Sequence, residues 1–122
     1  MEKTERIYWT STVILAGSIF FIGLVQAFHR QAEVDLITNL GFPVYFLTIL
    51  GSWEILGSII LVIPVKPAVK EWAYAGIFFV LSGAILAHVA AGDPLTATIP
   101  ALSLILLTVI SWLFRPKAAP IN

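Results

Sequence analysis

The sequence contains no cysteine. Without cysteine the chain cannot form a disulfide, and it has no thiolate that would bind a metal ion or carry out redox chemistry. Its histidines and acidic residues show neither HxxxH nor HxxE spacing. A phosphate-binding loop, a dinucleotide fingerprint and a nucleophilic triad are also missing. We therefore assign no metal ligand and no catalytic residue.

Charged residues are scarce as well. They make up 11% of the 122 residues, whereas soluble domains carry about 25%. Apolar residues reach 59%. A short soluble chain leaves much of its surface in water, so this composition fits a lipid bilayer as the solvent and partner. The net charge of zero provides no basic surface, which argues against nucleic acid as a partner.

Four apolar segments run through the sequence. They cover residues 7–28, 43–63, 71–91 and 94–114. Each has the length of ~20 residues that a helix needs to cross ~30 Å of hydrocarbon. Because lipid offers no hydrogen bonds, each segment must satisfy its own backbone as a helix. The predicted fold class is all-α: an integral membrane four-helix bundle, formed by residues 1–122 as a single domain.

Prolines mark the connections between these spans. Pro43 opens the second span, and Pro94 opens the fourth, with Asp93 before it as the expected N-cap. Pro100 then falls inside the fourth span. A proline in a helix interior removes a hydrogen bond, so we expect a kink there, with an irregular segment over residues 94–99 as the alternative.

The longest connection covers residues 29–42 and mixes apolar with charged residues. Val34, Ile37 and Leu40 recur at a helical spacing. This pattern is typical of a short interfacial helix with its apolar side toward lipid. An ordinary loop is the alternative.

Lysine and arginine are distributed unevenly over the two sides of the predicted bundle. One side carries the two termini and the second connection, with Lys3, Arg6, Lys66, Lys70, Arg115 and Lys117. The other side has only Arg30. Positive residues near membrane spans stay in the cytoplasm. Both termini are therefore expected there.

Two stretches resemble a known family. They are LGFPVYFLTILGSWEILGSI, residues 40–59, and KEWAYAGIFFVLSGAILAHVAAGD, residues 70–93. The first span adds Gly17, Gly23, Gln26, Ala27 and Phe28. Together they resemble the DoxX-like family of small bacterial integral membrane proteins, over nearly the whole chain. The resemblance implies a four-helix bundle in the bacterial inner (cytoplasmic) membrane.

The resemblance also implies classes of function. Relatives are linked to membrane thiosulfate and quinone oxidoreduction and to oxidative-stress complexes, and a distant animal relative assists the assembly of ion-channel receptors. Many relatives carry a lysine near the end of the first span, where this sequence has Gln26 and Ala27. The resemblance therefore transfers no charged-site role to the first helix.

Glu54 is an acid in the middle of the second span, ~16 Å from its outer end by the helical rise. A charged carboxylate at the bilayer centre costs ~2.5–3.5 kcal/mol on insertion scales. Gly51, Gly57 and Ser58 share its helical stripe, so we expect Glu54 to point into the bundle, uncharged or hydrogen-bonded. Hydroxyls expected at its depth are those of Ser18, Ser82 and Ser103. Glu54 as a purely structural interhelical group is the alternative.

Other polar residues form a predicted track from the outer face toward Glu54. The candidate ligand-binding residues are Gln26, Thr48, Ser52, Glu54 and His88. His88 lies ~6 Å from the outer end of the third span by the helical rise. Asp93 follows five residues later, a spacing that places it on a different part of the helix surface, so a His88–Asp93 pair is not expected. Satisfied groups near the lipid head groups are the alternative for Gln26 and His88.

Three functions fit these residues. The first is a non-catalytic membrane subunit, or at most an accessory subunit of a membrane oxidoreductase, that binds a quinone or a lipid within the bundle. The second is a structural or assembly-chaperone partner of another membrane protein, or a homo-oligomer, without a ligand. The third is a proton-coupled small-molecule transporter with Glu54 as proton carrier, which a bundle of four spans disfavours because it is small for alternating access.

Overall fold

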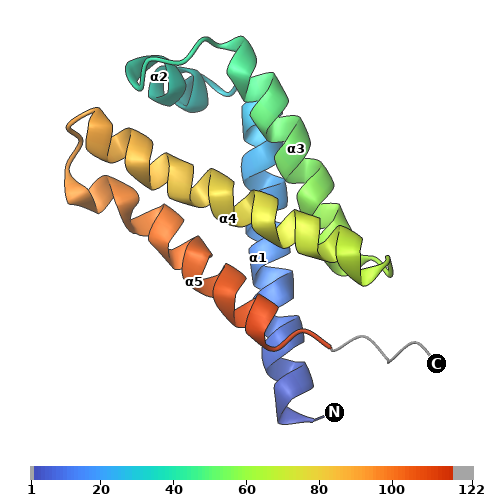
Figure 1. Cartoon of the computed structure of the whole chain (residues 1–122). Helices are drawn as coiled ribbons and strands as arrows, with labels where there is room; N and C mark the ends of the chain where they lie inside the picture. The colour runs from blue at the N-terminus through green and yellow to red at the C-terminus, as the bar shows by residue number, and fades with distance from the viewer. Residues whose placement is uncertain (1, 117–122) are drawn as a thin grey trace.

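The computed structural model describes residues 2–116, and most of this range is helical (Figure 1). The elements are α1 (Lys3–Ala27), α2 (Gln31–Asn39), α3 (Tyr45–Val62), α4 (Pro67–Ala90), the 3₁₀ turn η1 (Leu95–Thr98) and α5 (Ile99–Leu113). Within the described residues, α1, α3, α4 and the continuous η1–α5 segment are long and apolar enough to cross a membrane. The chain is therefore a multi-pass membrane protein of the all-α class, and its long helices lie close to the four apolar segments of the sequence.

The long helices form a ring in chain order. α1 packs against α3 and α5, and α4 packs against the same two helices. α1 and α4 thus occupy opposite corners of the bundle. Figure 1 shows the first residues of α1 and the last residues of α5 at one end, which we call the terminal end. The short helix α2 covers the opposite end, which we call the α2 end.

The core of the bundle consists of aliphatic and aromatic side chains from all the long helices. Leu15 and Ile19 of α1 pack with Leu61 of α3, Ile77 of α4 and Ala101 of α5. The outer surface is equally apolar, with a long series of exposed Phe, Leu, Ile and Val side chains. A soluble monomer does not expose apolar patches of this extent, so the outer surface is the one that faces lipid.

The closest contact between two helices joins α1 and α3. A Cβ atom placed on Gly51 would lie 2.6 Å from the carbonyl oxygen of Gly23 and 2.7 Å from the backbone nitrogen of Ala27. A Cβ on Gly23 would lie 2.9 Å from the carbonyl oxygen of Gly51. The two backbones touch only because neither residue has a side chain, as small residues allow in membrane bundles.

Several helices end in the same left-handed turn. Gly41 ends α2 with φ +93° and Gly92 ends α4 with φ +77°. His29 takes this position after α1 with φ +55°, although a left-handed conformation costs a non-glycine residue roughly 1–2 kcal/mol. The turn at His29 is closed by a 2.9 Å hydrogen bond from the N–H of Arg30 to the carbonyl of Val25.

The fourth span does not contain the predicted interior kink. Residues 95–98 form the 3₁₀ turn η1, which leads directly into α5. Pro100 lies in the first turn of α5. A proline there removes an N–H that has no partner within the helix, so it starts the α-helix without interrupting it.

The predicted short helix in the longest connection is present as α2, but its apolar side does not face lipid. Ile37 is buried, and Val34 and Leu40 are half-buried. α2 contacts α1 and α3. Its apolar side therefore packs onto the bundle and closes the α2 end.

Candidate functional site

Glu54 points into the bundle, as expected from the small residues around it. Its side chain is 6% exposed. It lies in the middle of α3, one turn after Gly51 and one turn before Ser58, which are also buried. The close approach of α1 at Gly51 leaves no room for lipid beside this stripe. α3 thus presents its acid to the interior.

Glu54 lines a groove of about 470 Å³ between α3 and α4. Trp53 and Leu56 of α3 form one wall, and Trp72 and Ile77 of α4 form the other. Among the described residues that line the groove, Glu54 alone has an ionisable side chain. Small-molecule sites usually have volumes of about 300–1,000 Å³ and mainly apolar walls with few polar groups. The groove has these properties.

Two buried oxygen atoms beside the α1–α3 contact lack hydrogen-bond partners within the described residues. They are Oε1 of Gln26 and Oε2 of Glu54. Gln26 follows Gly23 by one helical turn, and Glu54 follows Gly51 by one turn, so the two side chains flank the same contact. A buried polar atom without a partner typically costs about 1–3 kcal/mol. Of the two residues, only Glu54 lines the groove.

Two of the three hydroxyls expected to satisfy Glu54 bond to their own helices instead. Ser82 donates to the carbonyl of Phe79 at 3.1 Å, and Ser103 donates to the carbonyl of Ile99 at 2.9 Å. Serine in a helix often bonds to a carbonyl of the preceding turn in this way. The interhelical hydrogen bonds predicted for Glu54 are therefore absent among the described residues.

A second acid lies within electrostatic range of Glu54. This is Glu33, in the first turn of α2. Glu33 was not among the predicted site residues, because the apolar side of α2 was expected to face lipid. Glu33 precedes the buried Ile37 by four residues and therefore shares its side of the helix. The four-residue spacing between Glu33 and Ile37 is the sequence pattern from which the position of Glu33 could have been predicted.

Thr48 and Ser52 lie on the outside of α3 and do not join Glu54. Thr48 is exposed, and its Oγ1 is 2.8 Å from Nε2 of His29, the residue in the left-handed turn. Ser52 is exposed too, and its Oγ donates to the carbonyl of Thr48 at 2.7 Å. The structure thus places Thr48 with His29 at the α2 end. It does not bring the five predicted site residues together in one track.

His88 pairs with Asp93, contrary to the sequence-based expectation. The distance from Nδ1 of His88 to Oδ2 of Asp93 is 2.7 Å. The pair forms because the helix ends between the two residues. Gly92 takes a positive φ, and the N–H of Asp93 then bonds to the carbonyl of His88 at 3.0 Å. Asp93 makes no side-chain cap on the following helix, so its predicted role as an N-cap is also wrong.

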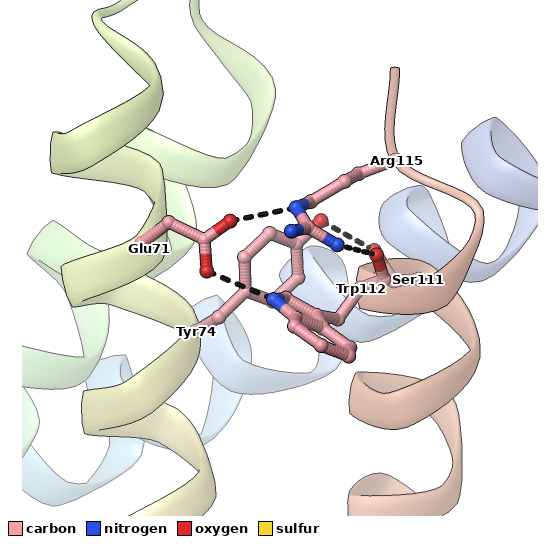
Figure 2. Close-up of polar contacts among 5 residues, drawn as sticks. All are labelled: Glu71, Tyr74, Ser111, Trp112 and Arg115. Carbon is pink, nitrogen blue, oxygen red and sulfur yellow. Dashed lines mark hydrogen bonds and ion pairs between the residues drawn. The ribbon is translucent and has the colours of Figure 1, made fainter. Parts of the chain in front are cut away.

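A buried network of hydroxyls joins three helices nearer the terminal end. Oγ of Ser111 lies 2.6 Å from Oγ1 of Thr12 and 2.8 Å from Oη of Tyr74. Figure 2 shows the Tyr74–Ser111 contact between α4 and α5. Because every member has a partner, the network links α1, α4 and α5 and leaves no free group for a ligand. The sequence analysis did not identify it.

Glu71, Trp112 and Arg115 form a second group of polar contacts beside this network (Figure 2). The carboxylate of Glu71 on α4 accepts from Nε of Arg115 at 2.6 Å and from Nε1 of Trp112 at 2.8 Å. The guanidinium of Arg115 stacks over the ring of Trp112, 4.3 Å from its centre. These contacts fasten the end of α5 to α4 where aromatic and basic residues favour the membrane interface. Among residues 2–116, no cluster of His, Asp and Glu is arranged to hold a metal ion.

Comparison with known proteins gives one result. The family model of the DoxX-like family matches residues 10–111. The chain belongs to this family. No curated protein and no solved structure matches it. The DoxX-like match runs from α1 to α5, so Gln26, Glu54 and the groove all lie within the DoxX-like region.

Proposed function

We propose that this DoxX-like protein is a non-catalytic membrane subunit that binds a lipophilic small molecule, a quinone or a lipid, in the groove between α3 and α4. One observation carries the proposal: an otherwise apolar groove of about 470 Å³ contains a single buried acid without a hydrogen-bond partner. An acid kept at such a position at a cost in stability indicates a use beyond packing.

The ligand would enter from the lipid. Trp53 and Trp72 are 66% and 74% exposed, so the walls of the groove continue into the lipid-facing surface. The apolar body of the ligand would lie against these walls, and its polar end would meet Glu54 at the floor. Gln26 of α1 also has an unpartnered oxygen among the described residues, but it is not one of the residues that line the groove.

The proposed location is the bacterial inner membrane, with both termini in the cytoplasm. Lys3, Arg6, Lys66 and Lys70 belong to the terminal end, whereas Arg30 lies at the α2 end. The excess of positive residues at the terminal end supports this orientation.

Two glycine substitutions test ligand binding. Gly76 lines the groove, and Gly83 lies on the same helix outside it. Neither would meet another atom within 4 Å of an added Cβ. In detergent, quinone analogues and short-chain lipids should raise the melting temperature of the wild type. Gly76→Leu should remove the shift by filling the groove, and Gly83→Leu should retain it. No shift with any probe would refute the proposal.

A second candidate function is docking of a partner helix without a ligand. It is favoured by the same open space beside Gly76 and Gly83 on α4, which would admit another backbone. Crosslinking in native membranes distinguishes docking of a partner helix from ligand binding. A crosslinked neighbour on α4 that Gly76→Leu and Gly83→Leu both remove would support docking, whereas a ligand-induced shift lost only in Gly76→Leu supports the groove.

A further inference from the structure

Two buried oxygen atoms without a partner among the described residues flank the α1–α3 contact, and the one on Glu54 lies in the groove. Oε2 of Glu54 and Oε1 of Gln26 are buried without a partner. Glu54 and Gln26 are 6% and 9% exposed. Within residues 2–116, ion pairs join Asp93 to His88 and Glu71 to Arg115, so no basic residue is paired with Glu54. A ligand that binds the ionised form of Glu54 must supply hydrogen-bond donors.

The local electrostatics favour a positive charge. Glu33 of α2, which is not among the residues that line the groove, is a second acid whose charge acts on Glu54. Two nearby carboxyl groups repel each other when both are charged, and a cation between or beside them relieves that repulsion. Trp53 and Trp72 give the same groove apolar walls for the rest of such a ligand.

We propose that the groove between α3 and α4 binds a lipophilic amine, whose ammonium group donates hydrogen bonds to the carboxylate of Glu54 while its apolar body lies against Trp53 and Trp72. This inference rests on the proposed function, since it names the head group that the same groove accepts. A cation in hydrocarbon needs a counter-charge, and Glu54 provides it in a place where water does not. A quinone offers carbonyl acceptors and would bind the protonated form of Glu54, whereas an ammonium group binds the carboxylate.

The position of Glu54 also limits the size of the head group. Glu54 lies at the middle of α3, which extends from Tyr45 to Val62. A residue at that depth in a membrane span is far from the layer of lipid head groups. A compact ammonium on a single apolar body reaches it more easily than the phosphate-bearing head of a two-chain lipid.

The test compares three probes that differ in their polar end: decylamine, decanol and decylubiquinone. The protein is placed in nanodiscs of phosphatidylcholine, a lipid without N–H donors, and binding is followed by tryptophan fluorescence. Decylamine should bind the wild type at least about tenfold more tightly than decanol, because hydrogen bonds between charged groups are the stronger ones. Glu54→Gln should lose about the same factor for decylamine and leave decanol unchanged.

Glu5→Gln is the matched control, because Glu5 is an exposed acid in the first turn of α1, away from the groove. It should bind decylamine like the wild type. If Glu54→Gln does not fold, the order of affinities of the three probes for the wild type still tests whether the groove prefers an amine. Competition by added phosphatidylethanolamine would assign the ammonium to a lipid head group, and no competition would assign it to a free amine.

The outcomes separate the inference from the proposed function. Equal binding of decylamine and decanol, or tighter binding of decylubiquinone, would refute the preference for an amine. Either result would still support ligand binding in the groove. Equal loss of decylamine binding in Glu5→Gln would overturn the role of Glu54. No binding of any probe would overturn both.

Discussion

Glu54 is a buried acid that has no hydrogen bond to any other residue of the range 2–116, and this makes its effect on stability predictable. A structural acid would hold helices together, and its loss would destabilise the bundle. An acid kept for a ligand imposes a desolvation cost on the empty protein. We propose that Glu54 belongs to the second class, because Ser82 and Ser103, two of the serines expected to bond to it, bond to their own helices instead.

We therefore expect Glu54→Leu to stabilise the empty protein by about 1–3 kcal/mol, the usual cost of an unpartnered buried polar group. The same variant should lose ligand binding, a common exchange between stability and function. Reversible unfolding in mixed micelles measures the first effect. A destabilisation of similar size would instead identify Glu54 as an interhelical hydrogen-bonding residue.

Ser111 is the opposite case, a buried hydroxyl with partners on both sides. Ser111→Ala would leave Oη of Tyr74 and Oγ1 of Thr12 without their contact to this residue. We expect a destabilisation of about 1–3 kcal/mol, measured by the same unfolding assay. Ser103→Ala serves as the control, because that exposed hydroxyl bonds only to its own helix. A Ser111→Ala variant as stable as the control would contradict a structural role for the network.

At the scale of elements, the contact between α1 and α3 fixes where the groove lies. The two backbones touch at Gly23 and Gly51, and Glu54 follows Gly51 by one turn. This contact sets the rotation of α3 about its axis. It therefore directs the side chain of Glu54 toward the interior of the bundle, where Glu54 lines the groove between α3 and α4.

Alanine at Gly51 should separate the two helices. Its Cβ would lie 2.6–2.7 Å from backbone atoms, which cannot move aside as a flexible side chain does. Overpacking of this kind costs about 1–3 kcal/mol. Gly83→Ala, on α4 with no atom within 4 Å of the new Cβ, should be neutral in the same unfolding assay. Equal stability of the two variants would show that α1 and α3 are not in contact at Gly51.

The membrane-spanning helices could be predicted from the sequence, because long apolar runs leave few alternatives in lipid. The inward direction of Glu54 was predictable as well, because Gly51 and Ser58 mark a close-packed stripe. The groove was not predictable. The groove depends on the distance between α3 and α4 along their lengths, and no local sequence pattern predicts this distance.

The errors concern segments where a helix ends. The His88–Asp93 pair depends on a reversal at Gly92, after which helical spacing no longer applies. The predicted kink at Pro100 assumed one uninterrupted α-helix, whereas a 3₁₀ turn precedes it. The apolar side of α2 was predicted to face lipid, whereas it packs on the bundle. An amphipathic pattern does not distinguish a helix that lies on lipid from one that packs on the end of a bundle.

For the whole molecule, the distribution of charge predicts the orientation in the membrane. The chain has no native cysteine, so single cysteines can be introduced without background. Ala68 is exposed at the terminal end, and Ala32 is exposed in α2. In bacterial spheroplasts, a membrane-impermeant maleimide should label Ala32→Cys at once and Ala68→Cys only after lysis. The reverse pattern would show that the termini face outward.

The central claim is that the acid of α3 lies in a groove that holds a ligand. An experimental density map of the protein purified in nanodiscs from native membranes tests it most directly. The account predicts the carboxylate of Glu54 inside the bundle, with density for a non-protein molecule beside it between α3 and α4. A Glu54 side chain extending into the acyl chains, or a groove filled by the protein's own side chains, would contradict it.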